Sequence, residues 1–129
     1  MIILDSNGKP YRRTVVFDVE TTGLYPEAGD RIIEIGAVAL DGDNILDEFH
    51  SLIEVGRLIS PEAQRTHGIT KEMLAVQPRA EEVFPRFCIF IEDSIMIAHS
   101  AEFDLSFVWS EFRRFRLDFS QPYYRTLAL

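Results

Sequence analysis

Three β-strand-like runs near the amino terminus constrain the fold of this chain most. "RTVVFDVE" (13–20) and "RIIEIGAVAL" (31–40) are rich in Val and Ile, and "ILDEFHSLIEV" (45–55) alternates less cleanly. The turn-forming stretches "TTGLYPEAGD" and "DGDN" separate these runs. Because links this short join strands that lie side by side, the pattern predicts an antiparallel, three-stranded meander.

The hydrophobic period changes after "SPEAQRTHGIT", and a helix is predicted there, in which Pro85 is tolerable only within the first turn. "SIMIAH" (94–99) then indicates a buried strand, and a second helix is predicted from about residue 101 to 116. The apolar positions at helical spacing are Val83, Phe84, Phe87, Cys88 and Ile91 in the first helix, and Leu105, Val108, Trp109 and Phe112 in the second. The order βββαβα predicts an α/β fold with a mixed sheet, in which a helical crossover reaches the fourth strand.

Length and charge limit the classes of protein to consider. A chain of 129 residues that is 47% hydrophobic suffices for one domain with one core. No apolar run approaches the roughly 18 to 20 residues of a membrane span, and the single cysteine, Cys88, excludes a disulfide within the chain, so we expect a cytoplasmic protein. The net charge of -8 argues against gripping nucleic acid by bulk electrostatics. This net charge is compatible with an enzyme that holds nucleic acid through metal ions.

Two acids interrupt the first strand-like run. Side chains alternate across a strand, so Asp18 and Glu20 share one face with Val16. Carboxylates at this spacing repel each other unless a cation or a shared proton relieves the repulsion, and a pair of divalent metals about 3.5 to 4 Å apart would suit them. The alternative is that both acids lie on an exposed strand end with no chemical role.

A third acid, Asp104, is predicted in the first turn of the second helix, directly after the fourth strand. If the crossover places that strand beside the first, Asp104 comes near Asp18 and Glu20. The alternative is that Asp104 only stabilises the start of its helix through the helix dipole. His67 and His99 stay open in the same way, because a lone histidine is often structural.

Four motifs in register, "FDVETTGL", "RIIEIGAV", "THGIT" and "AHSAEFD", closely resemble the DEDD-type (DnaQ-like) 3′→5′ exonucleases, the group that contains the proofreading epsilon subunit of bacterial DNA polymerase III. The resemblance runs from about Thr14 to the end of the chain. It implies a ribonuclease H-like fold, hydrolysis of terminal phosphodiester bonds of DNA or RNA, and release of nucleoside 5′-monophosphates. It also implies a proofreading or repair role and a site for two Mg²⁺ or Mn²⁺ ions.

Carried over to this sequence, the resemblance makes Asp18, Glu20 and Asp104 catalytic metal ligands. It assigns no chemistry to Glu34, Ile35 and Gly36. The residues that it implies contact the terminal nucleotide are Thr21, Thr22, Gly23, Leu24, His67 and Phe103.

The family's third motif, a histidine or tyrosine followed by a fourth aspartate, has no match after Asp104. We therefore expect residues 1–129 to be a single, truncated exonuclease domain that lacks its C-terminal part and is inactive or weakly active alone. The abrupt end at "YYRTLAL" supports the same expectation. The partners expected are a single-stranded 3′ end, a DNA polymerase subunit and, through surface left uncovered by truncation, another copy of the chain; no membrane is expected.

Two other functions are compatible with the sequence. A catalytically inactive module that binds nucleic acid or protein would keep the fold without the chemistry, although it has no need of three acids at metal-ligand spacing. A ribonuclease H-like endonuclease would share the acids but not the "HGIT" loop.

Overall fold

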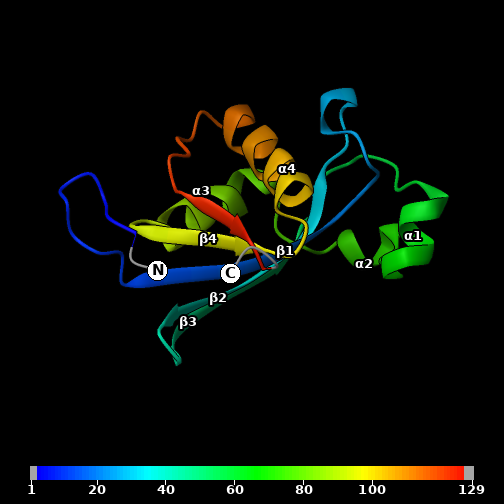
Figure 1. Ribbon diagram of the computed structural model, residues 1–129. Coiled ribbons are helices and arrows are strands. Elements are labelled where there is room, and N and C mark those ends of the chain that lie inside the picture. Colours follow the sequence, from blue (N-terminus) through cyan, green and yellow to red (C-terminus); the bar gives the residue numbers. More distant parts are fainter. Residues whose placement is uncertain (1–2, 127–129) are drawn as a thin grey trace.

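The computed structural model describes residues 3–126, and these form a sheet with helices packed on one face (Figure 1). The sheet has five strands in the order β3-β2-β1-β4-β5. The strands are β1 (Arg13–Thr21), β2 (Ile32–Asp41), β3 (Asn44–Leu52), β4 (Ser94–Ala98) and β5 (Tyr123–Arg125). The helices are α1 (Pro61–His67), α2 (Lys71–Leu74), α3 (Ala80–Phe90) and α4 (Ala101–Arg114), with a 3₁₀ turn, η1 (Pro26–Ala28), between β1 and β2.

The predicted meander and crossover are confirmed. β1 pairs antiparallel with β2, and β2 pairs antiparallel with β3 through a two-residue turn in which Gly42 has a φ of 59°. That left-handed conformation is easiest for glycine. β4 runs parallel to β1, with Val16 opposite Ile97. The parallel pairing brings the ends of β1 and β4 to the same edge of the sheet.

Two details differ from the expected order βββαβα. Residues 123–125 of the "YYRTLAL" segment form the short strand β5, parallel to β4, whereas residues 127–129 lie outside the described part of the chain. Pro85 lies within α3 rather than in its first turn, because the helix begins at Ala80. A proline at that position has no N–H to give to the carbonyl four residues earlier, a cost that the buried aromatic face of α3 offsets.

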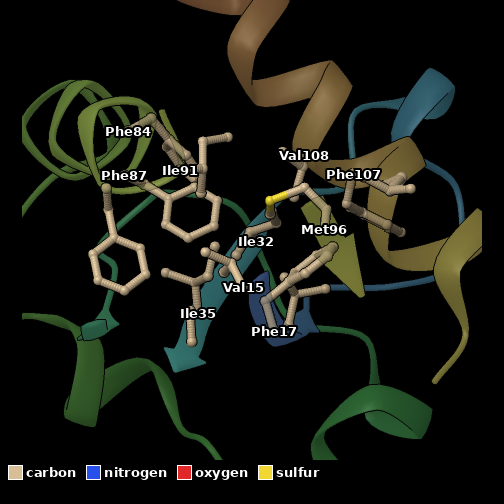
Figure 2. Close-up of a cluster of buried hydrophobic side chains, with 14 of the residues drawn as sticks. Val15, Phe17, Ile32, Ile35, Phe84, Phe87, Ile91, Met96, Phe107 and Val108 are labelled. Atoms are coloured by element: carbon tan, nitrogen blue, oxygen red, sulfur yellow. The ribbon is translucent and has the colours of Figure 1, made fainter. Parts of the chain in front are cut away.

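The core lies between the sheet and the pair α3 and α4 (Figure 2). β1 contributes Val15 and Phe17, which are almost fully buried, while α3 contributes Phe84 and Phe87. The ring of Phe87 lies 6.3 Å from that of Phe112 of α4 and 82° from parallel, an edge-to-face arrangement that aromatic pairs favour. Trp109, expected on the same apolar face, is instead 36% exposed and packs against Phe119 and Tyr123.

The opposite face of the sheet is not covered by α3 or α4, and Figure 1 shows α1 and α2 beyond one end of the sheet. Val16 is exposed on this open face. Among residues 3–126, no helix is both long and apolar enough to cross a membrane. The sequence-predicted site residues lie on β1 and in the loop after it, at the end of α1 and in the first turn of α4.

Candidate active site

β1 carries Asp18 and Glu20 toward the open face of the sheet. Val15, Phe17 and Val19 are buried on the core side, whereas Asp18 is exposed and Glu20 is partly buried. This alternation agrees with the side-chain period of two expected for a strand. Both acids therefore project from one side of β1, near its end.

Asp104 reaches the same place from α4. The helix begins three residues after β4 ends, and Asp104 in its first turn is only 3% exposed. Burial, and then the negative charges of Asp18 and Glu20, raise the pKa of Asp104 from 3.8 to about 7. The charges of Asp18 and Glu20 therefore act on Asp104, although Asp104 lies on a different element of the fold.

Glu20 experiences the same crowding. Burial raises its pKa, Asp18 and Glu34 raise it further, and His67 partly opposes them.

Within residues 3–126, no group of three or more His, Cys, Asp and Glu side chains is gathered closely enough to hold a metal ion as it stands. An all-oxygen donor set fits a hard cation such as Mg²⁺ or Mn²⁺ better than Zn²⁺, which usually recruits His or Cys.

A cavity of about 400 Å³ adjoins Glu20. Glu20 lies on its wall, and Tyr25, not singled out in the sequence, lies there too. Five of the six residues predicted to contact a nucleotide line it: Thr21, Gly23, Leu24, His67 and Phe103. The exposed side chain of Leu24 and the ring of Phe103 offer apolar surface of the kind on which a base can stack or pack.

Thr22, the sixth predicted contact residue, does not line the cavity. Its side chain is fully buried. Its hydroxyl donates to Oδ1 of Asp30 at 2.9 Å and accepts from the backbone N–H of Arg31 at 3.0 Å. The side chain of Thr22 thus helps to shape the loop after β1, and a nucleotide contact by this residue stays a prediction.

Asp30 organises the same loop, and sequence reasoning missed it. Burial would raise its pKa, but hydrogen bonds from the Tyr25 N–H, the Thr22 hydroxyl and Arg57 outweigh burial and lower it. The carboxylate lies against the α-carbon of Gly23, where any Cβ would clash with it. Gly23 is therefore required for close packing, and the only sequence signal for Asp30 was its position in a turn.

His67 is held by two backbone groups. Its Nδ1 accepts from the N–H of Ile69 at 3.0 Å, and its Nε2 lies 3.0 Å from the carbonyl oxygen of Thr21. Because a carbonyl can only accept, Nε2 carries the proton and donates to it. Both nitrogens are thus occupied, and the ring ties the "HGIT" loop to the end of β1. By contrast, Nδ1 of His99 lies 3.2 Å from the hydroxyl oxygen of Thr126.

Comparisons with known proteins identify the family of the chain. Residues 15–129 match the RNase_T exonuclease family. The chain is 50% identical over 117 residues to the PolC-type DNA polymerase III of Thermotoga maritima, covering 89% of this chain and 8% of that protein. It is 44% identical over 95 residues to the DNA polymerase III epsilon subunit of Treponema pallidum, covering 74% of this chain and 44% of that protein. The chain thus spans less than half the length of these relatives.

Solved structures give the fold. E. coli exonuclease I in complex with a dA16 oligonucleotide superposes with a TM-score of 0.80 at 18% identity, covering 89% of this chain and 28% of that one. This likeness confirms the ribonuclease H-like fold implied by the motifs. Because the family match covers residues 15–129, the chain belongs to the RNase_T exonuclease family, in agreement with the resemblance of its motifs to the DEDD-type exonucleases.

Proposed function

We propose that this chain is the core of a metal-dependent 3′→5′ exonuclease that removes nucleotides from single-stranded DNA or RNA as nucleoside 5′-monophosphates. The observation that supports the proposal most is the place of Glu20 in the wall of the 400 Å³ cavity, while the charges of Asp18 and Glu20 act on the buried Asp104. An isolated acid that only capped α4 would not need burial next to two other carboxylates. The relatives named as polymerase III proteins support a cytoplasmic proofreading or repair role beside a DNA polymerase subunit.

In this proposal Asp18, Glu20 and Asp104 hold Mg²⁺ or Mn²⁺. A divalent ion held there would supply Lewis acidity to activate water and to offset negative charge at the phosphate. The chain's own contribution is orientation. Gly23, Leu24 and Phe103 line the part of the cavity wall that receives the terminal nucleoside. Because Glu20 lines the same cavity, a nucleoside bound there places the scissile phosphate next to the carboxylates.

In this proposal His67 has a structural role and is not the proton acceptor. Its two ring nitrogens are both engaged with backbone groups, so neither is free to take a proton from water. It holds the carbonyl of Thr21 and thereby the wall of the nucleotide cavity.

The experiment uses one single-stranded oligonucleotide sequence, made as DNA and as RNA, and labelled either at its 3′ end or at its 5′ end. Each labelled form is incubated with the chain and Mg²⁺ or Mn²⁺. The expected result is slow release of labelled mononucleotide from the 3′ end, analysed by chromatography, and its loss in Asp18→Ala. Internal cuts would indicate an endonuclease instead. Binding without any Asp18-dependent release would favour the alternative, an inactive module with an exonuclease-like fold.

A further inference from the structure

A second, smaller cavity of about 140 Å³ lies on the open face of the sheet. Its walls come from β1, β2 and β3, and they consist of Asp18, Val19, Glu20, Glu34, Gly36 and His50. Val19 and Glu20 also line the larger cavity, so the two hollows meet at Glu20. A strand whose terminal nucleoside occupies the larger cavity can therefore continue over the smaller one.

Gly36 forms the floor between Asp18 and His50. In the register of the sheet, Gly36 is the partner of Asp18 on one side and of His50 on the other. Two strand spacings, about 10 Å, thus separate the backbones of Asp18 and His50. Because Gly36 has no side chain, the space between them stays open, and the first atom that a Cβ there would meet is Cδ2 of His50 at 3.9 Å.

His50 is oriented by a carboxylate. Its Nε2 lies 2.7 Å from Oε2 of Glu34, and its side chain is 64% exposed. Nδ1 makes no hydrogen bond to any group within residues 3–126. In the protonated ring both nitrogens donate, one to Glu34 and the other outward. Of the side chains that line this cavity, His50 is the one that can carry positive charge.

We propose that His50, held by Glu34, binds a backbone phosphate of the substrate strand adjacent to the phosphate at the carboxylates. The inference rests on the proposed function, since it places the scissile phosphate at Asp18 and Glu20. A polyanion that approaches three acids in a chain of net charge -8 needs a compensating donor. Nδ1 of His50, which makes no hydrogen bond within residues 3–126, supplies that donor, and Gly36 leaves room for the strand to pass.

The test measures affinity for a labelled single-stranded oligonucleotide by fluorescence anisotropy over a range of salt concentrations. Ca²⁺, which also prefers carboxylate oxygens, replaces Mg²⁺ so that the oligonucleotide stays intact. The buffer is held at about pH 6 so that histidine side chains in general are protonated. His50→Gln is expected to weaken binding about three- to tenfold. It should also lower the slope of log K against log salt by about 0.7, the value for one phosphate contact.

Two variants separate charge from structure. His50→Arg keeps a cation and is expected to retain the salt slope, whereas Lys9→Gln, which removes a charge from the remote amino-terminal turn, is expected to change neither affinity nor slope. In a Glu34→Gln background the effect of His50→Gln should shrink, because the ring loses its orienting partner. Thermal unfolding checks that each variant is folded.

The outcomes distinguish this inference from the proposed function. If the chain releases mononucleotides in an Asp18-dependent manner while His50→Gln keeps full affinity and an unchanged salt slope, the phosphate contact is wrong and the exonuclease proposal stands. If the chain binds the oligonucleotide through His50 but never hydrolyses it, the contact stands and the exonuclease proposal fails.

Discussion

Arg31 and Glu111 form a buried, bidentate ion pair that joins the start of β2 to α4. Nε of Arg31 lies 2.9 Å from Oε2 of Glu111, and Nη2 lies 2.9 Å from Oε1. The N–H of Ile32 donates to the same carboxylate at 3.2 Å, and Glu111 is 1% exposed. Glu111 follows Asp104 by about two helical turns, so the pair fixes the helix that presents Asp104.

Replacing Glu111 by Ala is expected to lower the free energy of unfolding by about 3 to 5 kcal/mol, because it leaves Arg31 largely buried without a counter-charge. Urea denaturation measures this loss. Glu102→Ala on the same helix is the control, since its pair with Arg125 is exposed and should contribute less than about 1 kcal/mol. Equal losses in the two variants would show that burial of the Glu111 pair has no special importance.

Gly23→Ala is expected to disturb the loop after β1, because the new Cβ would clash with the Asp30 carboxylate. Overpacking of this kind costs about 1 to 3 kcal/mol of stability, and affinity for a single-stranded oligonucleotide should fall with it. Gly36→Ala is the stability control, since its Cβ would meet only an ordinary contact at 3.9 Å. Calorimetry that found Gly23→Ala as stable as Gly36→Ala would contradict the packing argument.

The stability of the metal-free protein should fall as pH rises from about 4 to 7. The pKa of Asp104 is raised from 3.8 to about 7 in the folded state, so within this range the folded protein binds more protons than the unfolded chain. The contribution of Asp104 is therefore favourable at low pH and is lost as pH approaches 7. Urea titrations in EDTA should show a flatter pH dependence for Asp104→Asn, and an unchanged dependence would contradict the buried, crowded carboxylate.

His67→Gln is expected to reduce the rate of mononucleotide release by less than about tenfold and to leave the shape of the pH–rate profile unchanged. A general base is worth about 10² to 10⁴ in rate, whereas His67 only supports Thr21 and Ile69 through hydrogen bonds. Stability should fall by about 1 kcal/mol. A hundredfold loss of rate together with the loss of one limb of the profile would identify His67 as the proton acceptor.

The sequence predicted the parts of the fold that have a periodic signal. Alternation in "VVFDVE" placed Asp18 and Glu20 on one face, and the helical period of 101–116 predicted α4, which ends at Arg114. Short links predicted the meander, and the crossover predicted that β4 would lie beside β1. β5 was missed because three residues are too few to establish a period.

The rest depends on contacts between residues far apart in the chain. Arg31 meets Glu111 across 80 positions, and His50 meets Glu34 across two strands, so neither pair has a local signature. The motif that predicts a nucleotide contact by Thr22 likewise carries no sign of the hydrogen bond from its hydroxyl to Asp30. The close packing that decided each case is visible only in three dimensions.

We propose that Asp18, Glu20 and Asp104 form one metal-binding site, and a titration with Mn²⁺ followed by electron paramagnetic resonance tests this most directly. The unchanged chain is expected to bind Mn²⁺ weakly, and Asp18→Asn and Asp104→Asn should each reduce that affinity at least tenfold, because each removes one of three anionic ligands. Glu102→Gln, which removes a charge from the exposed side of α4, should leave the affinity within about twofold. Mn²⁺ binding that survives unchanged in both Asp18→Asn and Asp104→Asn would show that the three carboxylates do not share an ion.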